Sequence, residues 1–332
     1  MIRATYEIEP AGAAEEFARI ESTGLPTGPE RVRARVVGEE AGRAVLDFPE
    51  TNWGGDATLL VSALFAGAWA DSAAFTRCRL VGLDWPDGLL PGPAFDAPGG
   101  VLVGAIVKPS LGLSPGEAAD TAAALAGGGA DLVKDDELLG DPEWCPLEER
   151  VRRVVDAIPS EVRYAPNVTG PPESLLARAE RAVELGAGAL MLNVFAQGVG
   201  ALVALRRAAL GVPLFAHRVG AALWTRQPRF GVAPAVVAEL TRRCGADYVQ
   251  VGSFTGSVFD PPEEVRLQIA ACHRGQPRSV AVLGGGVGPE NAADQVRQSG
   301  VDSGLMVLLG SAVYRHAGGV EEGVRATVEA VR

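Results

Sequence analysis

The run VLVGAIV (101–107) begins a unit that recurs seven more times toward the C-terminus. Each unit joins a short apolar, β-rich run with a polar end to a helical stretch rich in Ala, Arg and Glu. The later runs are ADLVK (130–134), VRYAPN (162–167), ALMLNV (189–194), VPLFAH (212–217), ADYVQV (246–251), SVAVLG (279–284) and LMVLLG (305–310). Apolar strands that alternate with helices are typical of a parallel sheet covered by helices. Eight such units predict a closed (β/α)₈ barrel.

Residues 1–84 follow a different pattern. Strands are expected at IRATYEI (2–8) and RVRARVV (31–37), and helices near residues 12–20 and 56–70. Alternating strands interleaved with helices predict a small α+β domain of the ferredoxin-like type. The segment 85–100 is rich in Pro and Gly and is typical of a linker. We therefore predict an N-terminal domain over residues 1–98 and a barrel domain over residues 99–332.

Composition excludes several classes of function. The chain has 332 residues and a formal net charge of −11, which argues against a nucleic-acid-binding surface. No apolar stretch approaches the length of a membrane span, and the N-terminus MIRATYEIEP lacks the apolar core of a signal peptide. The four cysteines have no C-x-x-C spacing, which favours reduced structural thiols. We expect a cytoplasmic protein with no nucleic-acid or membrane partner.

Lysine usage points to two positions. The chain has 30 basic residues, but only Lys108 and Lys134 are lysines, and both follow short apolar runs. Arginine stays charged, whereas a lysine amine can lose its proton and act as a base or nucleophile. The alternative is a compositional bias toward arginine that left two lysines by chance. Their shared position after strands favours amine chemistry.

Polar residues follow each expected barrel strand, where the active sites of such barrels lie. In strand order they are Lys108; Lys134, Asp136 and Glu137; Asn167; Asn193; His217 and Arg218; Ser253 and Thr255; Gly284, Gly285 and Gly286; Gly310 and Ser311. Amines, carboxylates, amides and glycine-rich turns are thus expected to meet at one end of the barrel.

The tetrapeptide KDDE (134–137) predicts a metal site. Asp136 and Glu137 supply the oxygen ligands that Mg²⁺ prefers. A free ammonium on Lys134 would repel the ion, but reaction with CO₂ would convert this lysine to an anionic carbamate with ligand oxygens. The alternative interpretation is a salt-bridged acidic loop.

The glycine-rich turns after the seventh and eighth strands predict a phosphate site. Backbone N–H groups reach an anion closely where no side chain intervenes, and this is the usual phosphate position in such barrels. The candidates are Gly285, Gly286, Gly310 and Ser311, with Arg218 as a second anion contact. The glycines also fit a plain tight turn, and His217 also fits a buried structural histidine. His273 and His316 are expected at the surface.

Several motifs together resemble one family. They are GAIVKPSLGLSP (104–115), GGADLVKDDELLG (128–140), MLNV (191–194), AHR (216–218), GGG (284–286) and LLGSAVY (308–314), with STG (22–24) as a fainter match. The chain resembles the large subunit of RuBisCO, and more closely the RuBisCO-like proteins that do not fix CO₂. The resemblance implies an α+β N-terminal domain followed by a (β/α)₈ barrel.

The resemblance also implies roles for the candidate residues. Lys134 matches the carbamylated lysine, Asp136 and Glu137 match the carboxylate ligands of Mg²⁺, and Lys108 matches the amine that moves protons at the reacting carbons. Asn193 matches a residue near the metal. His217 and Arg218 match a substrate hydroxyl contact and a phosphate contact. Gly285, Gly286 and Gly310 match phosphate-binding backbone. The family arrangement further implies a homodimer, or a dimer-based oligomer, with the active site at the subunit interface.

Departures from the family pattern narrow the function. RuBisCO has a lysine after the sixth strand that stabilises the carboxylated intermediate, but GSFTGSVFDPPEE (252–264) contains none. Ser110 stands where the family has a second lysine. Ala66 stands where RuBisCO has an asparagine and the methionine-salvage enolases have a lysine base. Leu25-Pro26 replaces an aromatic pair near one phosphate site. These changes disfavour CO₂ fixation and favour a substrate with a single phosphate or an altered second end.

We therefore predict a Mg²⁺-dependent isomerase or lyase that acts through an enediolate. The expected substrate is a phosphorylated keto-sugar or sugar acid, and enolisation, isomerisation and decarboxylation all remain open. One alternative is a Schiff-base enzyme of the aldolase type that uses Lys108 or Lys134. Another is a non-catalytic protein that binds a phosphorylated ligand.

Overall fold

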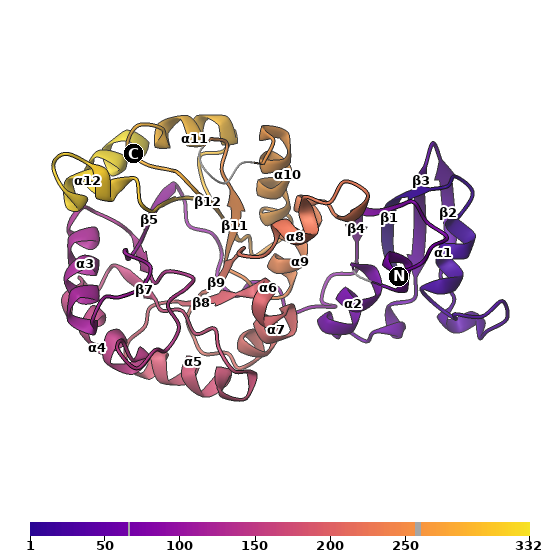
Figure 1. The fold of residues 1–332 in the computed structure, drawn as a ribbon, viewed down its shortest axis with the longest axis horizontal. Helices are drawn as coiled ribbons and strands as arrows, with labels where there is room; N and C mark the ends of the chain where they lie inside the picture. The colour runs from indigo at the N-terminus through magenta and orange to yellow at the C-terminus, as the bar shows by residue number, and fades with distance from the viewer. Residues whose placement is uncertain (66, 256–259) are drawn as a thin grey trace.

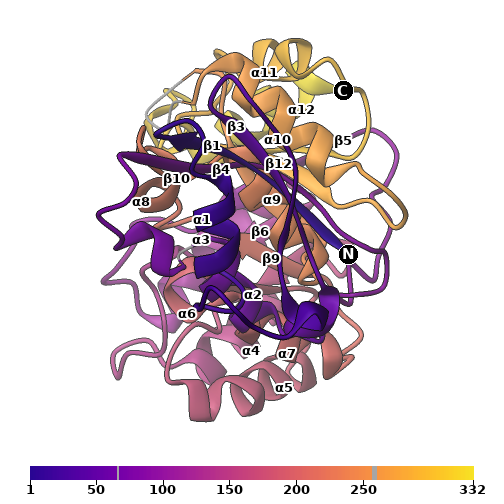
Figure 2. The same ribbon diagram turned by 90° about the vertical axis from the view of Figure 1, so that its right-hand side faces the viewer.

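The computed structural model describes residues 1–65, 67–255 and 260–332. A helix-covered barrel lies beside a smaller N-terminal domain built on one sheet (Figure 1). In the perpendicular view the N-terminal domain lies in front of the barrel (Figure 2). Within the described residues, no helix has the length and apolar character needed to cross a membrane.

Eight parallel strands form the barrel in the order β7-β6-β5-β13-β12-β11-β9-β8. They are β5 (Val101–Ile106), β6 (Leu132–Lys134), β7 (Arg163–Ala165), β8 (Leu190–Asn193), β9 (Leu214–His217), β11 (Tyr248–Gly252), β12 (Val280–Gly284) and β13 (Leu305–Leu309). The outer strands β7 and β8 meet through a parallel bridge between Asn167 and Met191. There the Met191 N–H donates to the carbonyl of Pro166 at 2.9 Å. The predicted barrel is confirmed.

Helices pack around the outside of the barrel. They are α3 (Pro115–Gly127), α4 (Leu147–Ala157), α5 (Leu175–Glu184), α6 (Val194–Gln197), α7 (Val199–Arg207), α8 (Ala222–Thr225), α9 (Pro234–Arg243), α10 (Pro262–Cys272), α11 (Ala292–Ser299) and α12 (Val320–Val331). α3 shows how the sequence sets such a helix: Ser114 and Glu117 form a capping box, and Pro115 occupies the first turn. Inside the barrel, large apolar side chains such as Phe215 and Met306 fill the space between the strands.

The N-terminal domain has the β-α-β-β-α-β order of a ferredoxin-like fold. Its elements are β1 (Ile2–Glu9), α1 (Ala14–Ile20), β2 (Arg35–Glu40), β3 (Arg43–Phe48), α2 (Ala57–Leu64) and β4 (Arg77–Asp84). β1 lies between β3 and β4 and pairs antiparallel with both. Tyr6, Phe17 and Trp69 pack together in the core of this domain.

Two predicted element boundaries in this domain are wrong. The strand expected over residues 31–37 starts only at Arg35, because a 3₁₀ turn covers Glu30–Val32, where the Val32 N–H donates to Pro29 O at 3.2 Å. The turn has no buried residue, so its apolar–polar alternation faces solvent. The helix expected over residues 56–70 ends at Leu64.

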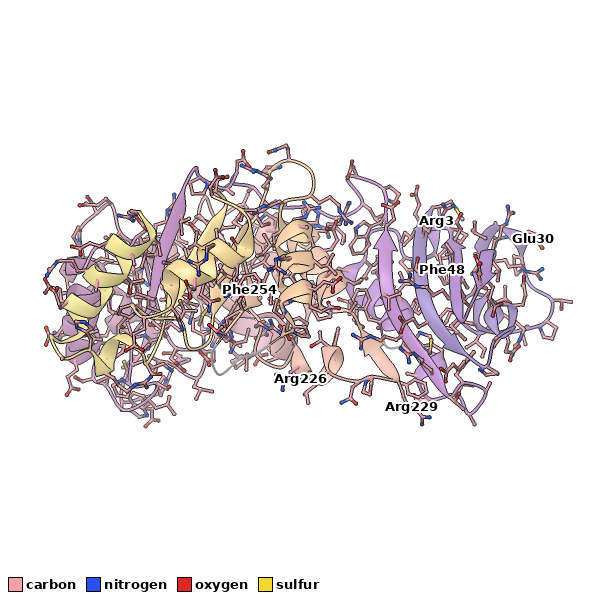
Figure 3. All side chains as sticks on the ribbon, turned by 90° about the horizontal axis from the view of Figure 1, so that it is seen from above. Arg3, Glu30, Phe48, Arg226, Arg229 and Phe254 are labelled. Carbon is pink, nitrogen blue, oxygen red and sulfur yellow. The ribbon has the colours of Figure 1, made fainter. Side chains whose placement is uncertain are left out.

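A segment of the barrel domain joins the N-terminal sheet. Strand β10 (Phe230–Val232) follows α8 and pairs in parallel with β4, where Phe230 lies opposite Cys78. Arg226 and Arg229 lie on the segment that runs from the barrel to this sheet (Figure 3). The division of the chain between residues 98 and 99 stays a prediction, since this crossing ties the two parts together.

Candidate active site

Lys108 lies two residues beyond β5, with its amine at the start of the KDDE loop. Its Nζ donates to Asp136 Oδ2 at 2.5 Å and to Ser110 Oγ at 2.9 Å. Its backbone N–H donates to the hydroxyl of Tyr314 at 2.9 Å, and that hydroxyl donates to Ile106 O at 2.8 Å. The backbone of Lys108 is thereby tied to a residue beyond β13, while Asp136 and Ser110 hold its amine.

Lys134 is the last residue of β6 and its side chain is fully buried. The Nζ donates to the backbone carbonyl of Asp135 at 2.6 Å and lies 5.8 Å from the centre of the Phe215 ring. Burial lowers the pKa of Lys134 to about 8, against the opposing effect of Glu137 and Asp136. At pH 7 roughly one amine in ten is then neutral. Only the neutral amine can react with CO₂.

Amide side chains from two neighbouring strand ends hold the backbone of Glu137. Asn167 Nδ2 and Asn193 Nδ2 donate to the Glu137 carbonyl at 3.1 and 2.8 Å. The Oδ1 atom of Asn193 is buried and has no hydrogen-bond partner among the described residues. A buried polar oxygen without a partner is costly unless a ligand satisfies it. This oxygen is therefore a candidate ligand contact.

His217, the last residue of β9, faces the same loop. Its Nε2 lies 3.5 Å from Glu137 Oε2. The Val219 N–H donates to Nδ1 at 3.2 Å, which places the ring proton on Nε2. Burial, together with the positive charges of Lys134 and Arg218, lowers the pKa of His217 well below its usual value. The imidazole is thus neutral near pH 7, and its contact with Glu137 is not an ion pair.

The turn after β12 contains two glycines of the predicted phosphate site, which stays a prediction. Gly285 and Gly286 have φ angles of 106° and 80°, which favour glycine. A cavity of about 420 Å³ beside this turn is lined by Gly286 and Arg315, among others, and Arg315 has no ion pair with any described residue. Ser311 is exposed after β13. At Gly310 an added Cβ would contact only Ile106, at an ordinary distance of 3.8 Å. Steric crowding therefore does not require a glycine at this position.

Arg218, predicted as the second anion contact, already has a carboxylate partner. Its Nη1 lies 2.7 Å from Asp260 Oδ2. The two side chains are only 12% and 7% exposed. Its role as a phosphate contact stays a prediction.

The residues of the KDDE loop fit a Mg²⁺ ion when Lys134 is a carbamate, and do not fit it when Lys134 is an ammonium. Among the described residues, no three His, Cys, Asp or Glu side chains are grouped as metal ligands, so Asp136 and Glu137 need a third donor. With Lys134 as an ammonium, two carboxylates face two lysines and the group is formally neutral. As a carbamate, Lys134 adds oxygen donors and makes the group doubly negative, which suits a hard divalent cation. The partnerless Asn193 oxygen beside the loop fits the same interpretation.

Asp135 organises this loop, and our sequence analysis gave it no role. Its Oδ1 accepts from the Tyr164 hydroxyl at 2.5 Å. Its Oδ2 accepts from Arg150 Nε at 3.1 Å and from the Asn167 N–H at 2.9 Å. All four residues are buried. A sequence signal was available, since Arg150 shares the apolar face of α4 with Leu147, Val151 and Val154.

Loss of the buried Arg150–Asp135 pair should destabilise the protein. We expect Arg150→Met to lower the free energy of unfolding by about 3–5 kcal/mol, because a buried charge would lose its partner. Arg152→Met is the matched control: Arg152 lies on the same helix, and its pair with Glu148 is about half exposed, so a change below about 1 kcal/mol is expected. Urea unfolding measures both. Equal effects would contradict the structural role of Arg150.

Two sequence-based comparisons with RuBisCO concern residues that the structure describes only in part. Ala66 and residues 256–259 lie outside the described residues. Before the second gap, the Ser253 hydroxyl donates to the carbonyl of Gly285 at 3.0 Å and so joins β11 to the turn after β12. The absence of lysine from residues 252–264 is a property of the sequence itself.

The strand ends of a (β/α)₈ barrel bring together two lysines, two carboxylates and a neutral histidine, which is an arrangement typical of the active end of a barrel enzyme. Residues 93–271, more than half of the chain, match the family model of the ribulose bisphosphate carboxylase large chain, catalytic domain. The chain belongs to this family.

Characterised relatives of the chain have different activities. A 2,3-diketo-5-methylthiopentyl-1-phosphate enolase from Geobacillus kaustophilus is 32% identical over 90% of this chain and 76% of the relative. A 3-oxo-isoapionate-4-phosphate decarboxylase from Rhizobium rhizogenes is 29% identical over 99% of this chain and 92% of the relative. The octameric RuBisCO of Pyrococcus horikoshii superposes with a TM-score of 0.90 at 28% identity, covering 99% of this chain and 87% of that one. The predicted resemblance to RuBisCO and RuBisCO-like proteins is confirmed.

Proposed function

We propose that the protein is a Mg²⁺-dependent enzyme that forms an enediolate from a phosphorylated keto-sugar or sugar acid. The reaction is an enolisation, an isomerisation or a decarboxylation. The observation that carries this proposal is the contact of the Lys108 amine with Asp136 at 2.5 Å, beside the buried Lys134. The relatives named as an enolase and a decarboxylase act on phosphorylated compounds and support the same chemistry.

Lys134 as a carbamate, Asp136 and Glu137 are the residues that would hold Mg²⁺. The ion would polarise a substrate carbonyl and so increase the acidity of the neighbouring C–H group. Lys108 moves the proton at that carbon, with its Nζ held in place by Asp136 and Ser110. His217 would present its Nε2–H to a substrate oxygen. General acid–base groups act only within hydrogen-bond reach of the proton that they transfer.

The phosphate of the substrate would lie at the turns after β12 and β13. Backbone N–H groups of Gly285 and Gly286 would contact it, with Gly310 and Ser311 on the neighbouring turn. Carboxylation of ribulose bisphosphate is not part of this proposal. The lysine that RuBisCO uses after the sixth strand is missing, and neither lysine of the chain lies near that position in the sequence.

Mg²⁺ binding tests this proposal directly. We expect calorimetry to show tighter Mg²⁺ binding in bicarbonate than in a CO₂-depleted buffer, because the carbamate supplies the third ligand. Keto-sugar phosphates should then exchange a C–H proton with D₂O only when Mg²⁺ is present, as followed by NMR.

Other results would contradict parts of the proposal. Binding that does not respond to bicarbonate would remove the carbamate and leave a plain carboxylate site. Metal-independent exchange, with trapping of substrate by borohydride, would favour the Schiff-base alternative instead. Metal binding without exchange on any substrate tested would favour a non-catalytic binding protein.

We also propose that the active site is completed in a homodimer or a dimer-based oligomer. Large apolar side chains are exposed on the segments that follow barrel strands: Leu111 and Leu138 on loops are 51% and 61% exposed, and Leu223 in α8 is 74% exposed. We expect these side chains to be covered in the assembly, since contiguous exposed apolar surface marks protein interfaces. The RuBisCO of Pyrococcus horikoshii is an octamer. Light scattering of the purified protein distinguishes a dimer from a monomer.

A further inference from the structure

An ion pair joins Arg218 and Asp260 beside Gly252, the last residue of β11. Arg218 follows β9, and Asp260 lies two residues before α10 begins. The guanidinium Nη1 and the carboxylate Oδ2 are 2.7 Å apart, and both side chains are largely buried. The pair therefore joins the loops that follow two neighbouring strands of the barrel, β9 and β11.

The end of β11 is shaped around this pair. Gly252, its last residue, has a φ of +92°. A Cβ at this position would lie 2.6 Å from Arg218 Nη1 and 2.8 Å from Asp260 Oδ2. A side chain at this residue would be strained by the positive φ, and its Cβ would displace the terminal atoms of both partners. The absence of a side chain at Gly252 lets the backbone of β11 approach this largely buried pair closely.

The pair changes the charge that a ligand meets on this side. A lone arginine would offer a two-pronged, permanently charged site to a phosphate. With Asp260 in contact, the charge is neutralised, and a phosphate would face a carboxylate as well. Displacing Asp260 would leave a buried carboxylate unpaired, which is strongly unfavourable. At the turn after β12, Arg315 lines the cavity beside Gly286 and has no ion pair among the described residues.

We propose that Asp260 determines substrate specificity by neutralising Arg218. The pocket then has one anion-binding end, at the turns after β12 and β13. The end between β9 and β11 receives an uncharged polar group such as a hydroxyl. The substrate is a monophosphate, and bisphosphates gain no affinity from their second phosphate. This inference rests on the proposed function, because it places the substrate in that site.

The test compares how ribulose 5-phosphate and ribulose 1,5-bisphosphate bind, by calorimetry in EDTA. Without metal or turnover, the result does not depend on the Mg²⁺ chemistry, which the bicarbonate experiment tests separately. The wild-type protein should bind the two sugars with affinities within about 3-fold of each other. Asp260→Asn frees the guanidinium and should bind the bisphosphate at least ~10-fold more tightly than the monophosphate, the usual effect of a charge-assisted hydrogen bond.

Asp294→Asn is the matched control, since it removes an aspartate that pairs with an arginine on the exposed surface of α11. It should keep the wild-type ratio. A wild-type preference of 10-fold or more for the bisphosphate would overturn the proposal. So would a folded Asp260→Asn protein, judged by circular dichroism, that keeps the wild-type ratio or binds no bisphosphate.

A second variant covers the case in which Asp260→Asn does not fold. Arg218→Met combined with Asp260→Asn removes both buried charges, so neither is left unpaired. The proposal expects this double variant to bind the monophosphate within about 3-fold of wild type, because Arg218 does not hold the phosphate. A loss of 10-fold or more would show that Arg218 is the phosphate contact and would overturn the proposal.

Discussion

Replacement of Lys134 by arginine is expected to abolish Mg²⁺ binding while the fold is retained. Arginine keeps a positive charge beside Asp136 and Glu137 and cannot form the carbamate. Loss of a residue that only orients a metal ligand typically costs 10–100-fold in affinity, so loss of a ligand should exceed ~100-fold. Enediolate formation should be lost together with the metal.

Calorimetry in bicarbonate measures this effect, and circular dichroism checks the fold. Lys134→Met is the companion variant, because it removes the amine without adding the bulk of a guanidinium to a fully buried position. Both variants should bind Mg²⁺ equally poorly with and without bicarbonate. Metal-dependent activity that survives in either variant would remove Lys134 from the mechanism.

Replacement of Lys108 by methionine is expected to separate proton transfer from metal binding. Proton exchange on the substrate should fall by about 10²–10⁴-fold, the usual contribution of a general acid or base. Mg²⁺ affinity should be unchanged or higher, because Asp136 loses the ammonium that contacts it at 2.5 Å. The loss should appear in kcat, since Lys108 is not part of the proposed phosphate site at the turns after β12 and β13.

Lys108→Arg is the matched control for this variant. It keeps a positive charge beside Asp136 but cannot give up a proton near neutral pH. NMR measurement of deuterium incorporation should find both variants slow. Full activity in the arginine variant would mean that Lys108 supplies only charge, and the proton-transfer role would be wrong.

Much of the fold could be predicted because its signals are local. Eight apolar runs, each with a polar end, predicted the eight barrel strands, and all eight are present. Strand β10 was not predicted, because three residues of ordinary composition form a strand only through pairing with β4, about 150 positions earlier in the chain. The short turn at Glu30–Val32 has strand-like alternation but no buried face, and burial is a tertiary property.

The candidate active site was also predictable only in part from the sequence. Lys108, Lys134, Asp136 and Glu137 were recognised from their motifs, and the structure brings Lys108 into contact with Asp136, 28 residues along the chain. Their metal and catalytic roles stay predictions. The neutral state of His217 was not predicted, since it depends on burial and on the charge of Lys134.

The sequence by itself determined the barrel, the family and the chemical character of the strand ends. Periodicity, motif spacing and the presence of only two lysines are properties of neighbouring residues or of composition. Only the tertiary structure decided which charges are already neutralised. Asp260 reaches Arg218 across 42 residues, and Arg150 reaches Asp135 across 15, through packing that no local pattern encodes. The free energy of a charge depends on its surroundings in space, because burial and partners set both its solvation and its Coulomb energy.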